Sequence, residues 1–391
     1  MTPDSNRQPE ETGLRLAMVL PDLRRAGAES VVVSLCRNLA GLGVEVHLVI
    51  IGPRCEYQNE LATSGVRIHR LALYEQGPIR FYRQDLHWRI RRRLWHLFRA
   101  LKPDVVHFHI MHSLVWGGAV ARAAGAKILF TAHGLDPCLA GNDLPSRWRR
   151  MLYTRAIAAS HCRLLAVSPS VAQHQAHGLH RDSQSITLQP NPVDLSACHP
   201  PPQPQMVVER AIMVGTLHPL KRVHMGLLAL QAWLETTPSA ELWVVGDGAE
   251  RSRLEAMAQQ GRLAGKVSFL GVRTDVPDLL RTAGVAWLLS EREGMPMAAL
   301  EAMASGVPLV ATDVFGTRDL VRHEVNGLLV PLDKPEMVAH ASQRIRQEAD
   351  LRHRLVAGGM ATARLCESTR IARDHLAHYR RALGKTDAGR S

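Results

Sequence analysis

The sequence predicts an α/β protein built from two Rossmann-like domains, and three observations carry this prediction. The chain has 391 residues, which is enough for two domains of ordinary size. Short apolar runs typical of buried parallel strands alternate with helical segments along most of it. A proline-rich segment at 199–206 interrupts the alternation near the middle, as a stiff linker between domains would. We therefore expect domains at 14–198 and 207–367.

Composition restricts the class and the compartment of the protein. Apolar residues make up 46% and charged residues 21%, which is normal for a soluble globular protein. No apolar run reaches the roughly 18 residues of a membrane helix. Residues 1–13 are polar and acidic, unlike a secretory or transit segment, and we expect them to be disordered. The six cysteines are scattered, which fits free thiols and a cytoplasmic location.

The net positive charge is concentrated in the N-terminal half. The whole chain carries 48 Lys+Arg and 36 Asp+Glu; residues 1–190 contain 24 and 14 of these, and the remainder 24 and 22. A basic surface can meet nucleic acid, an anionic membrane or an anionic substrate. We expect no nucleic acid, since no stacking platform of aromatic residues or helix-turn-helix pattern supports it.

The first domain is predicted to begin with strands at 14–20 and 44–51 and a helix at 28–42 between them. Gly27 precedes that helix, where a small residue allows close approach to a phosphate, although a simple turn glycine is equally compatible. Further strands are predicted at 104–109, 127–132, 164–168 and 186–189.

Histidines stand at two of these strand ends. His109 ends one strand and His133 follows another, at the edge of a parallel sheet where ligands bind. A lone histidine in such a place is more often structural. The neighbouring His107, His109 and His112 invite a metal site, but no cysteine or carboxylate completes a ligand set, so we expect no metal.

The second domain is predicted to start with a strand at 211–214 and a glycine loop, Gly215-Thr216, that leads to Lys221 and Arg222. A lysine near a helix start after such a loop suits a diphosphate, and the alternative is a solvated surface lysine. Gly246 and Val272 follow the next two strands, at 242–245 and 267–270.

Two glutamates follow the apolar strand at 285–289. Glu293 lies in the loop, Pro296 suits the first helical turn, and Glu301 lies within an otherwise apolar helix that ends near Gly306. A glutamate in such a helix needs a partner. One interpretation is an arginine partner or a helix cap, and the other is a ligand whose hydroxyls both carboxylates accept.

Several motifs in order resemble one family over roughly residues 14–385. Glu293 and Glu301, followed by AMASGVPLVAT, resemble the glutamate motif of retaining glycosyltransferases of the GT-B fold, family four. The run Ala26–Glu29 resembles the family's glycine-rich loop, with Ala26 replacing one glycine. His133-Gly134 resembles its histidine loop and Asn191–Asp194 the segment before its linker. The resemblance implies two Rossmann-like domains facing across a cleft, with a C-terminal helix within 368–391 crossing back to the first domain.

The resemblance also implies roles. Glu293 would hold the transferred sugar, Glu301 the ribose, His133 the donor sugar and its phosphate, and Lys221 the diphosphate, while His109 would line the acceptor side. Thr216 replaces the family's usual arginine, which leaves more of the charge to Lys221 and Arg222. The implied donor-binding set is Gly27, Gly215, Thr216, Lys221, Arg222, Gly246, Val272, Gly294, Met295, Met297 and Glu301, with Glu293, His133 and Lys221 catalytic.

The implied reaction moves a hexosyl or N-acetylhexosaminyl group from a nucleotide-sugar, with UDP expected, to a hydroxyl of a glycan or lipid-linked acceptor, with retention of configuration. No metal cofactor is expected, because Lys221 and helix N-termini can offset the charge of the leaving diphosphate. Two alternatives are a nucleotide-sugar epimerase of the same fold and a non-catalytic, nucleotide-binding partner subunit.

A helix predicted at 86–102 carries the membrane hypothesis. Its leucines and Ile90 form one stripe, whereas Trp88 and Trp95 lie on the opposite side with Arg91, Arg92, Arg99 and Lys102 around them. Exposed tryptophan flanked by arginine is typical of a helix on an anionic lipid surface, and Trp148 with its arginine neighbours repeats the composition. We therefore predict peripheral docking on the inner face of the membrane. The alternative is that both tryptophans pack under a loop.

Overall fold

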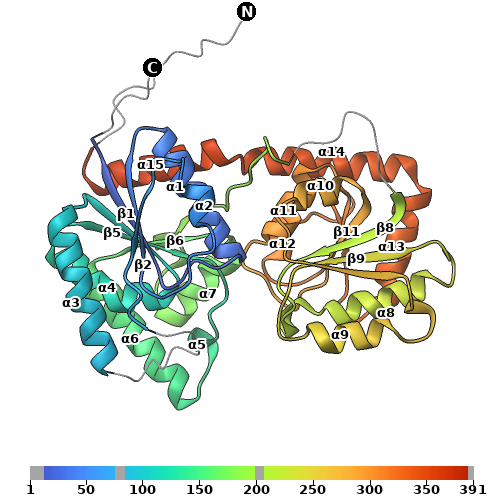
Figure 1. The fold of residues 1–391 in the computed structure, drawn as a ribbon, viewed down its shortest axis with the longest axis horizontal. Coiled ribbons are helices and arrows are strands. Elements are labelled where there is room, and N and C mark those ends of the chain that lie inside the picture. The colour runs from blue at the N-terminus through green and yellow to red at the C-terminus, as the bar shows by residue number, and fades with distance from the viewer. Residues whose placement is uncertain (1–12, 75–83, 199–206, 386–391) are drawn as a thin grey trace, which may run out of the picture. The chain divides into compact units, whose positions relative to one another are not determined.

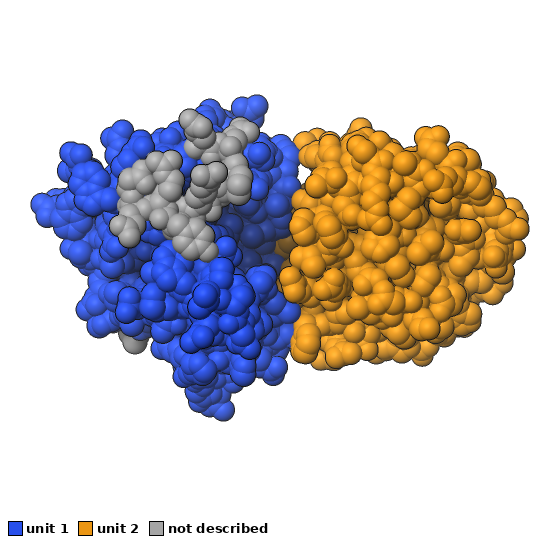
Figure 2. Space-filling model, turned by 90° about the horizontal axis from the view of Figure 1, so that it is seen from below, with its two compact units in different colours: residues 1–192, 368–391 blue, residues 193–367 orange. Residues whose placement is uncertain are grey.

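The computed structural model describes residues 13–74, 84–198 and 207–385, and the predicted linker at 199–206 and nearly all of the predicted disordered N-terminus lie outside these ranges. The chain forms two compact units, residues 1–192 with 368–391, and residues 193–367 (Figure 2). Each unit is an α/β fold around one parallel sheet (Figure 1). The predicted fold class is confirmed.

The first unit contains a seven-stranded sheet in the order β3-β2-β1-β4-β5-β6-β7, and its paired strands are parallel. The apolar strands form its centre, and nearly every residue of β1 is buried. The strands are β1 (Arg15–Leu20), β2 (Glu45–Ile50), β3 (Arg67–Arg70), β4 (Val105–His109), β5 (Lys127–Ala132), β6 (Arg163–Ala166) and β7 (Thr187–Leu188).

The helices of the first unit include one from the far end of the sequence. They are α1 (Gly27–Gly41), α2 (Gln58–Leu61), α3 (Gln84–Leu101), α4 (Met111–Ala123), α5 (Pro137–Ala140), α6 (Leu144–Ser160), α7 (Pro169–Leu179) and α15 (Ser368–Ala382). The last of these packs against α1 (Figure 1). Tyr379 of α15 is fully buried, and its hydroxyl lies 2.8 Å from Nδ1 of His107 on β4. The C-terminal helix therefore belongs to the first unit, as predicted.

The second unit contains a six-stranded parallel sheet in the order β10-β9-β8-β11-β12-β13. Its strands are β8 (Val207–Val214), β9 (Glu241–Val245), β10 (Val267–Gly271), β11 (Ala283–Leu288), β12 (Leu309–Thr312) and β13 (Leu328–Val330). Its helices are α8 (Val223–Trp233), α9 (Arg251–Ala258), α10 (Val276–Arg281), α11 (Met297–Ala304), α12 (Thr317–Leu320), α13 (Pro335–Gln347) and α14 (Ala349–Leu365).

Both faces of this second sheet are covered by helices. Along β11, Val285 and Trp287 belong to the core that includes α8 and α13, whereas Ala286 and Leu288 belong to the core that includes α11. Alternation of this kind places successive side chains on opposite faces. The strand order reverses between β8 and β11, which makes the loops after these two strands neighbours. Such a switch point is where ligands bind in doubly wound sheets.

Candidate functional site

The switch point of the second unit brings together two predicted residues that are far apart in sequence. Nζ of Lys221 donates to Oε1 of Glu293 at 2.6 Å. The Glu293 side chain is 10% exposed and that of Lys221 32%, so the ion pair lies at the surface of the site with one side open. A second bond, from the amide of Glu291 to the carbonyl of Leu220 at 2.9 Å, joins the two loops. The pair is therefore fixed by backbone as well as by charge.

The loop after β8 is shaped by a close backbone approach. The Gly215 amide donates to the carbonyl of Val245 at 2.9 Å. Gly246 follows with a φ of +132°, and a Cβ there would lie 1.9 Å from the Gly215 oxygen, so only glycine fits. A 3₁₀ turn at Pro219–Lys221 then delivers Lys221, and Arg222, in the left-handed region with a φ of 52°, starts α8.

The loop that carries Glu293 is held from beneath by residues that the sequence reasoning did not single out. The Glu293 amide donates to the carbonyl of Phe315 at 3.1 Å. Gly316 has a φ of +79°, and a Cβ there would lie 2.1 Å from the Glu293 oxygen. The hydroxyl of Thr312 donates to the carbonyl of Ser290 at 2.6 Å. The signal that could have found them is a glycine shortly after a buried strand that neighbours the glutamate loop.

Glu301 lies on α11, and its carboxylate has no partner among the residues that the structure describes. No hydrogen bond or ion pair joins its carboxylate to any side chain or amide in the described part of the chain. The arginine partner or helix cap considered above is therefore not what the described residues show. Burial raises the pKa of Glu301 to about 7. A partly buried carboxylate without donors is costly, and the hydroxyls of a ligand would reduce that cost.

Most of the other predicted donor residues lie at the same edge of this sheet. Gly294, Met295 and Met297 form the entry to α11, whose first residue follows Pro296 with no side-chain cap, so its leading amides suit an anion. Thr216 is exposed beside Gly215. Val272, 57% exposed, follows β10 at the same edge of the sheet.

Two of the predicted donor-binding residues are not directed at the Lys221–Glu293 pair. Arg222 pairs with Asp333, so the Lys221 ammonium, and not the Arg222 guanidinium, is the cation at Glu293. Gly27 belongs to the first unit, where it is the exposed first residue of α1, and Ala26 before it provides no side-chain cap.

In the first unit, His109 and His133 contact each other. Nδ1 of His109 lies 2.8 Å from Nε2 of His133, so one ring donates its proton to the other. The outer nitrogens, Nε2 of His109 and Nδ1 of His133, are buried and have no hydrogen-bond partner within residues 13–74, 84–198 and 207–385. Burial lowers the pKa of His133 to about 4 and that of His109 well below its usual range, so both rings are neutral at pH 7. The pair can accept or donate one further hydrogen bond at each end.

His107 has a structural role beside this pair. It is fully buried, and its ring nitrogens lie 2.8 Å from the hydroxyls of Tyr379 and Thr131. The described residues include no group of three or more His, Cys, Asp or Glu side chains arranged to hold a metal ion. The clustered histidines instead bind hydroxyls and each other.

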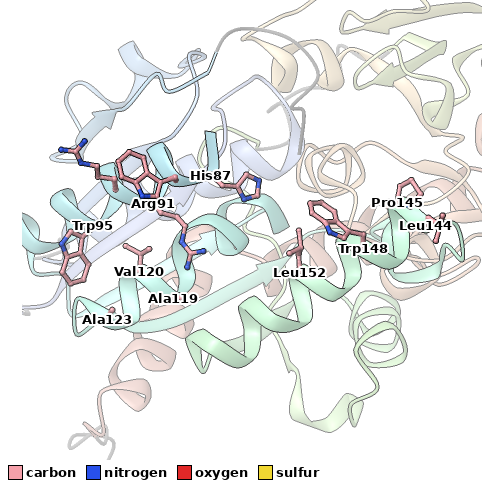
Figure 3. Close-up of a pocket in the computed structure, with 12 residues that line it drawn as sticks. His87, Arg91, Trp95, Ala119, Val120, Ala123, Leu144, Pro145, Trp148 and Leu152 are labelled. Atoms are coloured by element: carbon pink, nitrogen blue, oxygen red, sulfur yellow. The ribbon is translucent and has the colours of Figure 1, made fainter. Parts of the chain in front are cut away.

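The predicted membrane residues lie on α3. Trp88 is 63% exposed, Arg92 lies over its ring at 5.5 Å, and Arg99 lies over the Trp95 ring at 5.4 Å. Trp95 and Trp148 line a hollow between α3, α4 and α6 (Figure 3). Among the described residues, no helix is long and apolar enough to cross a membrane.

Family models match most of the chain. The model "Glycosyltransferase Family 4" matches residues 25–197, and "Glycosyl transferases group 1" matches residues 205–361, which contain Lys221, Glu293 and Glu301. The chain belongs to the family 4 glycosyltransferases. This confirms the predicted enzyme class and the resemblance on which it rested.

Relatives with known names support this glycosyltransferase assignment. A UDP-Gal:α-D-GlcNAc-diphosphoundecaprenol α-1,3-galactosyltransferase of Escherichia coli is 28% identical over 272 residues, which cover 65% of this chain and 69% of the relative. A D-inositol 3-phosphate glycosyltransferase of Frankia alni is 28% identical over 400 residues, covering 94% and 97%.

Solved structures share the fold. Sucrose-phosphate synthase from Thermosynechococcus elongatus superposes with a TM-score of 0.81 at 21% identity, covering 95% of this chain and 99% of that one. HepE of Anabaena in complex with UDP superposes with a TM-score of 0.76 at 16% identity, covering 93% and 99%.

Proposed function

We propose that this glycosyltransferase transfers a sugar from a UDP-sugar to a hydroxyl of a lipid-linked glycan, with retention of anomeric configuration, in cell-surface glycan assembly. The observation that carries the proposal is the Lys221–Glu293 ion pair at the switch point of the second unit. A nucleotide-sugar has a diphosphate beside a ring of hydroxyls. Lys221 can turn to the diphosphate while Glu293 accepts from the sugar hydroxyls, so one ligand satisfies both partners of the pair.

Glu301 supports a nucleoside as the rest of the donor. Its carboxylate has no partner among the residues that the structure describes. A ribose offers two adjacent hydroxyls that can donate to one carboxylate. UDP is the nucleotide we propose, because the galactosyltransferase relative is named for UDP-Gal and the HepE structure contains UDP.

In this proposal Glu293, whose carboxylate accepts from Lys221, binds hydroxyls and does not attack carbon. Retention requires the acceptor hydroxyl to attack the anomeric carbon on the face from which the diphosphate leaves, as the bond between that carbon and the diphosphate breaks. The leaving phosphate then takes the proton of the acceptor hydroxyl, while Lys221 and the uncapped start of α11 stabilise the charge that develops on the diphosphate. The roles we propose for His133 and His109 are contacts to the donor sugar and to the acceptor.

A lipid-linked acceptor is proposed from two observations. The galactosyltransferase relative is named for a diphosphoundecaprenol substrate, and α3 presents Trp88 and Arg92 together on its exposed side. Tryptophan with arginine suits the interface of an anionic membrane. We infer peripheral docking of this enzyme on the cytoplasmic face of the membrane.

Two experiments test the proposal. A calorimetric screen of UDP, GDP and ADP identifies the nucleotide, and mass spectrometry and NMR of products with diphosphate-linked lipid acceptors identify the transfer and its stereochemistry. Donor turnover without an acceptor would indicate the epimerase, and tight nucleotide binding without transfer to any acceptor would indicate the partner subunit.

Liposome flotation tests the docking separately. Wild type should float with anionic vesicles and not with neutral ones, and Trp88→Ser/Trp95→Ser should float less. Equal recovery of both proteins on anionic vesicles would remove α3 from the membrane hypothesis.

A further inference from the structure

An open hollow on the first unit has no role in the donor site. It lies between α3, α4 and α6, and we name it the α3–α6 groove (Figure 3). Val120 and Ala123 of α4 form its floor, while Trp88 and Trp95 of α3 and Trp148 and Leu152 of α6 form its walls. Its volume is about 1200 Å³, as large as sites that hold a complete organic ligand.

Small side chains create the hollow. α3 packs on α4 and α4 on α6, yet the exposed turns of α4 carry alanine at 119 and 123, so the outer edges of α3 and α6 stand apart above them. Leu144, at the start of α6, is 79% exposed beside the opening. An open hollow lined by tryptophan and aliphatic carbon is unusual on a monomeric protein and marks a binding site for apolar matter.

The charge around the groove is one-sided. Helices α3, α4 and α6 contain ten arginines and one carboxylate residue, Asp85. None of the arginines of α3 and α6 forms an ion pair with a carboxylate in the described part of the chain. Arg91 lines the groove, and Arg92 lies over the Trp88 ring at its edge. The groove therefore joins an apolar interior to a rim with an excess of positive charge.

This combination identifies one chemical class of occupant. Two copies of the same face would bring like charges together, which costs free energy. Bases of a single-stranded nucleic acid would stack on the tryptophans, but the alanine, valine and leucine side chains that line the rest of the groove offer a base no polar partner and favour a hydrocarbon chain. A hydrocarbon chain with a phosphate at one end satisfies both the interior and the rim.

We propose that the α3–α6 groove binds the hydrocarbon chain of a phosphate-headed membrane lipid, with Arg91 and Arg92 meeting the phosphate. This inference deepens the proposed function, on which it rests, because it gives a lipid-linked acceptor a built site for its chain and not only a surface to lie on.

Tryptophan fluorescence quenching tests the proposal with soluble probes. The probe is a bromine-tagged dodecyl phosphate below its micelle concentration, since bromine quenches tryptophan only near contact. A bromine-tagged dodecyl maltoside supplies the chain without the charge, and inorganic phosphate supplies the charge without the chain. We expect saturable quenching by the alkyl phosphate, weaker quenching by the maltoside, and neither quenching nor competition by phosphate.

Two pairs of variants locate the binding. Ala119→Leu/Ala123→Leu fills the groove, and Ala361→Leu is its control at an exposed alanine of α14. The filled variant should bind the alkyl phosphate about tenfold more weakly, because the hydrocarbon chain loses its apolar contacts with the groove. The control variant should bind it as tightly as wild type does. Arg91→Gln should remove the preference for phosphate over maltoside, whereas Arg364→Gln on α14 should retain it.

Three outcomes would overturn the proposal: equal quenching of the filled and wild-type proteins, no quenching of wild type, or displacement of the probe by a single-stranded oligonucleotide. UDP calorimetry on each variant reports folding and keeps the donor site apart. Transfer activity without a groove effect would refute only the groove, and probe binding without transfer would refute only the proposed function.

Discussion

The two units place polar residues at the same edge of a parallel sheet but prepare them in opposite ways. In the second unit, Lys221 and Glu293 are opposite charges within 2.6 Å. In the first, His109 and His133 are two neutral rings that share one hydrogen bond. The charged pair is suited to a diphosphate and its sugar, and the neutral pair to uncharged hydroxyls. The comparison teaches that one fold, used twice, can present a charged pair in one unit and a neutral pair in the other.

The largest effect should come from breaking the charged pair. Lys221→Ala leaves Glu293 without its cation and the diphosphate without a charge partner, so we expect kcat/KM to fall by about 10²–10³-fold. Arg222→Ala is the control, because Arg222 pairs with Asp333, and its effect should be several-fold smaller. Steady-state kinetics with the donor identified by the screen would measure both, and equal losses would contradict the separation of roles.

The neutral histidine pair should make the folded protein less stable at acidic pH. The pKa of His133 falls from 6.5 to about 4 on folding, so the unfolded chain binds the proton first, and stability is lost as pH falls from about 6.5 towards 4. We expect His133→Asn to reduce this loss by on the order of 2–3 kcal/mol at pH 4. Urea unfolding at pH 7 and pH 4.5 measures it. Parallel curves for the two proteins would mean that His133 is not buried neutral.

Glu301 should change the stability of the fold with pH in the opposite direction to His133. Its pKa rises from 4.5 to about 7 on folding, so its contribution favours the folded state below pH 4.5 and is lost as pH rises through 7. Glu301→Gln should therefore be more stable than wild type at pH 8 and not at pH 4.5.

The same residue should contribute to nucleotide binding. Glu301→Ala should weaken binding of the nucleotide diphosphate by about 1.5–3 kcal/mol, the cost of a lost charged hydrogen bond. Calorimetry with UDP, GDP and ADP tests this, and unchanged affinity for all three would refute the ribose role.

The smallest effect should come from adding charge to the second unit. Thr216 is exposed beside Gly215, so the Thr216→Arg variant should fold. It should bind the nucleotide diphosphate more tightly by about 0.5–1 kcal/mol, the contribution of a partly exposed ion pair. Thr216→Gln provides a control of similar length without the charge. If the arginine and glutamine variants bind alike, residue 216 does not face the phosphates.

The sequence predicted those parts of the fold and the site whose signal is local. Buried strands such as β5 and β11 are continuous apolar runs, and their ends were placed within about two residues. β3 was not predicted, since RIHR has a single apolar residue, Ile68, and forms an edge strand. Phe98, not Leu97, completes the buried stripe of α3.

Pairings across the fold could not be predicted in this way. The Lys221–Glu293 contact spans 72 positions, and its geometry depends on the strand order, which periodicity does not reveal. Gly316 appears in the sequence as an ordinary turn glycine, and its importance is visible only where its missing Cβ admits the Glu293 loop. Arg222 resembles a second phosphate ligand until Asp333, 111 positions away, is seen to pair with it.

Because α15 comes from the end of the chain, the two units are completed in a different order from the one in which their synthesis begins. Residues 193–367 form the second unit from one uninterrupted stretch, whereas the first unit needs α15, which the ribosome makes after everything else in that unit. Until Tyr379 is made, His107 lacks one of its two hydroxyl partners and the α15-facing side of α1 is uncovered. The N-terminal unit is thus translated first and completed last, and a chain truncated after residue 367 would contain the whole second unit but a first unit without α15.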